Sequence, residues 1–213
     1  MLKAKRKGDR IGKSAGQGNG SGRNGGDFGG SRGANGSFQM AHLGMWLAVG
    51  ALSMMFGALA LLYLARLGEK PNFVFEAPEV LWLSTVLILA SSATCHAGLR
   101  AVRRGNQGQF RNYAAVTLLL GLLFVASQAY AWVQLQQAGL ADPTNPFSVL
   151  FWILTGVHAF HVLAGLGWIG YVLYGANRGV FTAKRHLAVD LSSIYWHFMD
   201  GVWVVFFALF VFL

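Results

Sequence analysis

Five long stretches of this chain carry no Lys, Arg, Asp or Glu, apart from Asp200 in the last of them. Each is long enough for a helix to cross the hydrocarbon layer of a membrane, which takes about 20 apolar residues. Lipid offers backbone groups no hydrogen-bond partner, so a spanning segment is a helix or a strand of a closed barrel, and nothing here alternates like barrel strands. The sequence predicts an all-α polytopic membrane protein with five transmembrane helices, near residues 39–64, 79–99, 112–135, 146–174 and 191–213.

Positive charge is distributed unevenly along the chain. Charged residues make up 12% and the net charge is +9, whereas a soluble domain has roughly 25% charged residues. Most of the 17 Lys and Arg lie in residues 1–38 and in the second and fourth connections, which share one side of a five-helix protein. This distribution argues against binding of nucleic acid. By the positive-inside rule it predicts a cytoplasmic N-terminus and a C-terminus outside.

The first 38 residues are rich in Gly, Asn, Ser and Arg and have little apolar surface to bury. We therefore predict a disordered, basic cytoplasmic tail over 1–38, followed by a membrane domain over 39–213. Residues 20–25 spell GxGxxG, but no strand precedes them, so they do not indicate a dinucleotide site. Cys95 is the single cysteine, which excludes an internal disulfide and leaves zinc or iron–sulfur clusters without a ligand set.

Polar side chains inside the spans are few, and four of them have a regular spacing. His158 and His161 lie three residues apart on the fourth span, and His197 and Asp200 repeat that spacing on the fifth, so each pair shares a helix face. At about 1.5 Å per residue, Asp200 and His161 lie about 14 and 18 Å from the cytoplasmic end of their spans. We expect one structural, hydrogen-bonded cluster between the last two helices, with haem or metal ligation as the alternative.

Five segments together resemble subunit III of the haem–copper terminal oxidases, the cytochrome c and quinol oxidase family. Residues 195–203 (YWHFMDGVW) are similar to the family's YWHFVDVVW ending, and residues 155–162 (TGVHAFHV) to its TGFHGLHV segment. Residues 91–96 match SS-x-T-x-H, Phe124 with residues 128–130 matches FxxxQAYE, and residues 44–47 match the GMWLF opening. The order and the number of spans are those of the five-span bacterial form. Residues expected at helix–helix contacts or at the membrane interface are Gln128, Tyr130, Tyr195, Trp196 and Trp203.

The resemblance implies a non-redox accessory subunit of a proton-pumping oxygen reductase of aerobic respiration, in the bacterial cytoplasmic (inner) membrane. The chain itself is then expected to hold no catalytic centre, cofactor or metal. Subunit I, its main contact among the respiratory subunits, would carry the haems and copper. Phospholipid would fill a cleft between two helix groups, the first two spans and the last three, and the chain would support proton uptake and oxygen access. Head-group candidates near the cytoplasmic side are His96, Arg178, Arg185 and His186.

Two departures from the family pattern keep alternatives open. The buried Glu that usually follows GMW is absent, with Ala51 and Leu52 at the aligned positions, and the Glu after QAY is Ala131. Asp200 is then the only carboxylate expected inside the spans, which weakens a proton-antenna role. The alternatives are a subunit-III-like chain of a nitric oxide reductase, a stand-alone electron carrier with a b-type haem, and a small transporter. Cytochrome c and quinol both stay open as electron donors, because that choice resides in other subunits.

Overall fold

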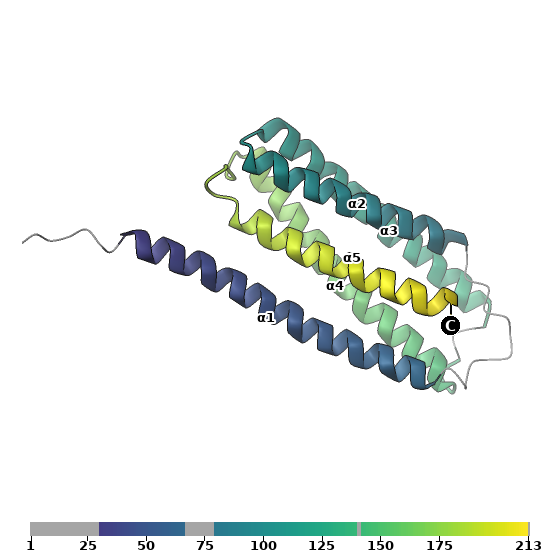
Figure 1. Ribbon diagram of the computed structural model, residues 1–213. Helices are drawn as coiled ribbons and strands as arrows, with labels where there is room; N and C mark the ends of the chain where they lie inside the picture. Colours follow the sequence, from purple (N-terminus) through teal and green to yellow (C-terminus); the bar gives the residue numbers. More distant parts are fainter. Residues whose placement is uncertain (1–29, 67–78, 140–141, 213) are drawn as a thin grey trace, which may run out of the picture.

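The computed structural model describes residues 30–66, 79–139 and 142–212, and these form five α-helices and no β-sheet (Figure 1). All five are long and apolar enough to cross a membrane, which confirms the predicted all-α membrane class. The helices are α1 (Gly30–Ala65), α2 (Glu79–Arg103), α3 (Gln107–Gln137), α4 (Pro146–Asn177) and α5 (Leu187–Phe212).

Short polar segments begin and end these helices. The side chain of Asn106 accepts a hydrogen bond from the backbone of Gln109 at the start of α3, and Asn145 accepts one from Phe147 at the start of α4. Such caps satisfy amide groups that have no partner in the first helical turn. Gly105 and Gly179 follow α2 and α4 with φ of 75° and 66°, the left-handed conformation that glycine adopts without a steric cost.

Helix boundaries differ from the sequence expectation at two places. Most of the predicted tail, residues 1–29, lies outside the described residues, but residues 30–38 belong to α1 and continue the first span as a helix. Helix α5 begins at Leu187 instead of residue 191, so Asp190 lies in its first turn. A negative side chain is favourable there because the amide groups at a helix N-terminus carry partial positive charge.

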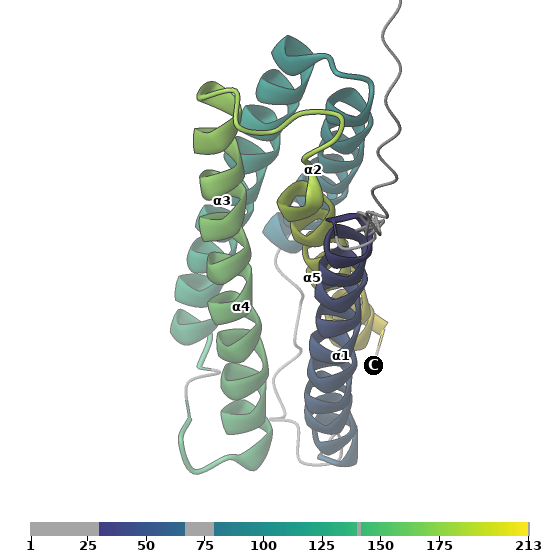
Figure 2. The same cartoon turned by 90° about the vertical axis from the view of Figure 1, so that its left-hand side faces the viewer.

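The helices do not group as expected from their order. The most extensive contact joins α2 and α3, and α5 packs against α2 and α4. Helix α1 packs on α4 and α5 only and shares no close contact with α2 in the described residues (Figures 1 and 2). The expected pairing of the first two spans is therefore wrong. The α2–α3 connection is only a few residues long and forces these helices together, whereas the longer segment before α2 leaves α1 able to dock elsewhere.

Trp196 of α5 lies at the centre of the bundle and is fully buried. It fits because glycine stands opposite: a Cβ atom on Gly121 of α3 would come within 3.0 Å of the indole ring, and one on Gly165 of α4 within 3.1 Å. Small residues of this kind let membrane helices approach closely. The indole Nε1 donates a hydrogen bond to Ser91 Oγ of α2 at 3.0 Å, so one side chain connects four helices.

Candidate functional site

Asp200 lies in the interior of the bundle on α5, with 4% of its surface exposed. Its nearest ionisable neighbour on the same helix is His197, with 4.0 Å between Nδ1 and the carboxylate Oδ2. That ring nitrogen already shares a hydrogen bond of 2.6 Å with Ser92 Oγ of α2. Neither oxygen of Asp200 has a hydrogen-bond partner within the described part of the chain. The carboxylate thus lies beside polar groups but accepts no hydrogen bond from them.

His158 of α4 has a different environment. Its imidazole is stacked against Trp203 at 5.8 Å between ring centroids and meets Phe206 edge-on at 5.5 Å. Both ring nitrogens are buried and lack a hydrogen-bond partner among the described residues. His161 bonds through Nδ1 to the carbonyl oxygen of Val157, 2.8 Å away.

The four residues thus occupy two sites instead of one hydrogen-bonded cluster. The pair on α4 packs among aromatic rings from α1 and α5, including Phe56, which lies 6.0 and 5.5 Å from the two imidazole rings. The pair on α5 contacts Ser92 of α2. The sequence predicted similar depths for the two pairs, but the rotation of each helix about its axis directs them to different neighbours.

The aromatic residues of the C-terminal motif lie at contacts between helices. Tyr195 donates a hydrogen bond to the carbonyl oxygen of His161 on α4 at 3.0 Å. Trp203 donates one through Nε1 to Thr85 Oγ1 on α2 at 3.2 Å, while Trp196 donates to Ser91 as described above. Tyr130, by contrast, is 57% exposed on the outer surface of α3. Its side chain therefore faces lipid or a partner chain.

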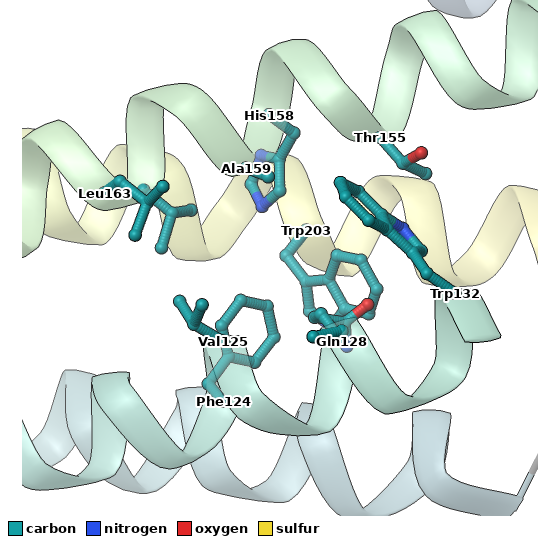
Figure 3. A pocket seen from close by; sticks show the side chains of 11 residues that line it. Phe124, Val125, Gln128, Trp132, Thr155, His158, Ala159, Leu163 and Trp203 are labelled. Atoms are coloured by element: carbon teal, nitrogen blue, oxygen red, sulfur yellow. The ribbon is translucent and has the colours of Figure 1, made fainter.

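A small cavity of about 120 Å³ lies between α3, α4 and α5. Its lining is largely apolar and aromatic and includes Phe124, Trp132 and Trp203 (Figure 3). Gln128 and His158 face it from α3 and α4. The Nε2 atom of Gln128 is buried and, like the nitrogens of His158, has no hydrogen-bond partner in the described residues.

Asp190 is a second buried carboxylate that the sequence analysis did not predict. It has 4% of its surface exposed, and Arg103 of α2 donates to its Oδ1 at 2.8 Å. His186 Nε2 lies 3.3 Å from its Oδ2. The expectation from the sequence that Asp200 is the only carboxylate inside the spans is therefore wrong. The sequence signal that could have revealed it is an Asp close to the start of the fifth span, directly after a connection that contains Lys and Arg.

The four head-group candidates fall into two environments. Arg178 is exposed at the end of α4 and stacks on the ring of Tyr174 at 4.7 Å, and Arg185 and His96 are exposed as well. His186 instead points to Asp190. Among the described residues no group of three or more His, Cys, Asp or Glu is arranged to hold a metal ion.

Comparison with known proteins agrees with this architecture. The sequence model of the cytochrome c oxidase subunit III family matches residues 67–213, which include α2 to α5. Cytochrome c oxidase subunit 3 of Thermostichus vulcanus is 31% identical over 78% of this chain and 84% of its own length. The probable subunit 3 of Nocardia farcinica is 33% identical over 77% and 82%, and quinol oxidase subunit 3 of Bacillus subtilis is 32% identical over 78% and 83%. The chain belongs to the cytochrome c oxidase subunit III family of haem–copper oxidases.

Proposed function

We propose that this chain is the non-redox accessory subunit of a proton-pumping haem–copper oxygen reductase, and that it stabilises the catalytic subunit. The observation that carries the proposal is the family match over 67–213, which takes in the buried contacts of α2 to α5. Haem and copper would reside in subunit I, the main partner. The relatives include a cytochrome c oxidase and a quinol oxidase, so the proposal is independent of the electron donor.

Helix α1 supplies the surface for partners and lipid in this proposal. Only 11% of the residues in its most apolar 18-residue stretch are buried by the rest of the chain. The side chains of Met40, Trp46 and Met54 are more than half exposed. Apolar surface of this extent is stable only against lipid or another membrane subunit. The distribution of Lys and Arg supports an N-terminus on the cytoplasmic side of a bacterial inner membrane.

An apolar groove between α1 and α5 is the proposed lipid cleft. It is lined by Phe56, Gly57, Gly201 and Val205, among others, and its glycines leave room for an acyl chain. This location replaces the cleft expected between the first two spans and the last three. The same groove would give oxygen an apolar route, and the lipid within it would support proton uptake by keeping the contact with subunit I intact.

Phosphate head groups would bind at the cytoplasmic end. Arg178 and Arg185 are exposed there and suit this role, with His96 as a further candidate. His186 is a weaker candidate because it already faces Asp190. Replacing Arg178 and Arg185 together with Gln is expected to reduce the anionic phospholipid retained after detergent extraction, measured by mass spectrometry of the purified complex.

Deletion of the chain tests the proposed function. An accessory subunit predicts that membranes lacking it keep their haem and copper content and their initial rate of oxygen consumption, while activity decays faster during turnover. Loss of haem in the deletion strain would favour the alternative of a chain with its own b-type haem. A deficit in nitric oxide reduction with normal oxygen reduction would favour the nitric oxide reductase alternative.

A further inference from the structure

The cavity between α3, α4 and α5 contains polar groups that the proposed function does not use. His158 is 3% exposed and directs its ring toward this space, and neither ring nitrogen has a partner within the described residues (Figure 3). The buried Nε2 of Gln128 is in the same situation on the opposite wall. Buried donors are almost always paired in native proteins, so two unpaired groups at one cavity indicate a ligand.

The size and lining of the cavity disfavour a cluster of waters. A volume of about 120 Å³ approaches that of an engineered cavity of about 150 Å³ that stays dry and holds benzene. Each buried water needs about two to four polar partners. The side chains that line the cavity offer few: Gln128, His158 and the indole N–H of Trp132, while Thr155 Oγ1 already donates to the carbonyl of Phe151. One oxygen on an apolar body suits these groups better than several waters.

The walls favour a flat ring. Phe124 and Trp203 are buried side chains whose ring centroids lie 5.2 Å apart with an angle of 80° between the ring planes. Trp132 lies at one end of the cavity, opposite Leu163 (Figure 3). Aromatic side chains attract planar rings in stacked and edge-on arrangements. A phospholipid acyl chain would fill the same space without an acceptor atom, and would leave His158 and Gln128 unpaired.

The cavity can be reached from the membrane. Ala129 of α3 and Leu163 of α4 line the cavity and are also exposed, Leu163 by 53%, so they form its rim toward the outer surface of the helices. A ligand with an apolar tail could enter between α3 and α4 and leave the tail in the bilayer.

We propose that this cavity binds the ring of a membrane-dissolved carbonyl compound of the quinone type. One carbonyl oxygen accepts hydrogen bonds from His158 and Gln128, the ring lies among Phe124, Trp132 and Trp203, and the tail passes the rim beside Leu163. The proposal concerns binding only and requires no electron transfer. It is independent of the role of the chain as an accessory subunit.

Binding of matched probes to the full-length chain, purified in lipid nanodiscs with the subunits that accompany it, tests the proposal. The probes are radiolabelled 2-decyl-1,4-benzoquinone and decylbenzene, which share ring size and tail and differ in the carbonyl groups. We expect saturable binding of about one quinone per chain above empty nanodiscs, and at least tenfold weaker binding of decylbenzene. Equal affinities would show a simple hydrocarbon cavity, and an absence of saturable binding would show a dry or hydrated one; either result overturns the proposal.

Variants separate this cavity from quinone sites on other subunits. Ala159→Phe fills the cavity while it leaves both polar side chains in the sequence, and should abolish one saturable site. Gln128→Leu and His158→Phe each remove one donor and should weaken quinone binding about fivefold, the effect of one lost hydrogen bond. Gln137→Leu on the exposed surface of α3 and His42→Phe on α1 are the matched controls and should bind normally. Unchanged stoichiometry in Ala159→Phe would overturn the proposal, even if His158→Phe failed to fold.

Discussion

Asp190 and Asp200 are two carboxylates on the same helix with equal burial and opposite surroundings. Asp190, in the first turn of α5, is held by Arg103 at 2.8 Å and His186 at 3.3 Å. Asp200, almost three turns further along the helix, has Ser92 and His197 nearby, with 4.0 Å to His197, and neither of its oxygens has a hydrogen-bond partner among the described residues.

The two carboxylates differ in their surroundings because Lys and Arg side chains reach the end of the span but not its middle. A long Arg side chain can extend from the end of one helix to the next while part of its surface stays near water, and the side chain of Arg103 is indeed 54% exposed. No Lys or Arg lies at the depth of Asp200 in any span, because an isolated cation there is costly. Asp190, at the end of the span, therefore forms an ion pair that joins α2 and α5. Asp200, in the middle of the span, can interact only with uncharged side chains and histidine.

Removing the cation at the edge should have the largest effect. Arg103→Ala leaves Asp190 buried beside only a histidine, and breaking a buried ion pair costs about 3–5 kcal/mol. We expect about 3 kcal/mol of lost unfolding free energy, since Arg103 is half exposed and partly screened. Unfolding in mixed micelles titrated with SDS measures this loss. Arg100→Ala, an exposed cation one turn earlier on α2, is the control and should cost less than about 0.5 kcal/mol.

The same substitution at the two carboxylates tests the comparison itself. Asp190→Asn removes the charge that Arg103 and His186 face, and should cost about 2 kcal/mol. Asp200→Asn keeps the shape of the side chain and removes a group that has no close cation, so it should change the unfolding free energy by less than about 0.5 kcal/mol. Equal losses at the two positions in the same SDS titration would show that Asp200 has a strong partner after all.

Loss of the hydroxyl beside His197 should have a smaller effect than loss of the edge charge. Ser92→Ala removes the 2.6 Å hydrogen bond between α2 and α5, and one such bond contributes about 1 kcal/mol. Ser53→Ala on α1, whose hydroxyl bonds only within its own helix, serves as the control. A loss above about 3 kcal/mol in Ser92→Ala would mean that Ser92, His197 and Asp200 act as one coupled network.

The number of spans and the family could be predicted from the sequence, because both depend on local patterns. Long uncharged stretches have one structural solution in lipid, and the motifs around His158 and Asp200 are contiguous. The family match covers residues 67–213, which agrees with the resemblance that those motifs carry.

Features that depend on rotation and docking of helices were not predictable in the same way. Hydropathy does not mark the first turn of a helix, so Asp190 was placed in a connection. Similar depth of His161 and Asp200 suggested contact, but each helix turns its polar residues toward a different neighbour. The docking of α1 on α4 and α5 depends on complementary surfaces, and the order of the spans carries no information about those.

Affinity purification of the tagged full-length chain in mild detergent tests the central claim most directly, with an optical spectrum and an oxygen-consumption assay on the eluate. An accessory subunit of a haem–copper oxidase predicts a large haem-bearing partner in a one-to-one ratio and oxygen reduction that copurifies with it. Stronger detergent should then release this chain free of haem while the partner keeps its spectrum. A chain that elutes alone, or that retains a b-type haem spectrum after separation, would contradict the account.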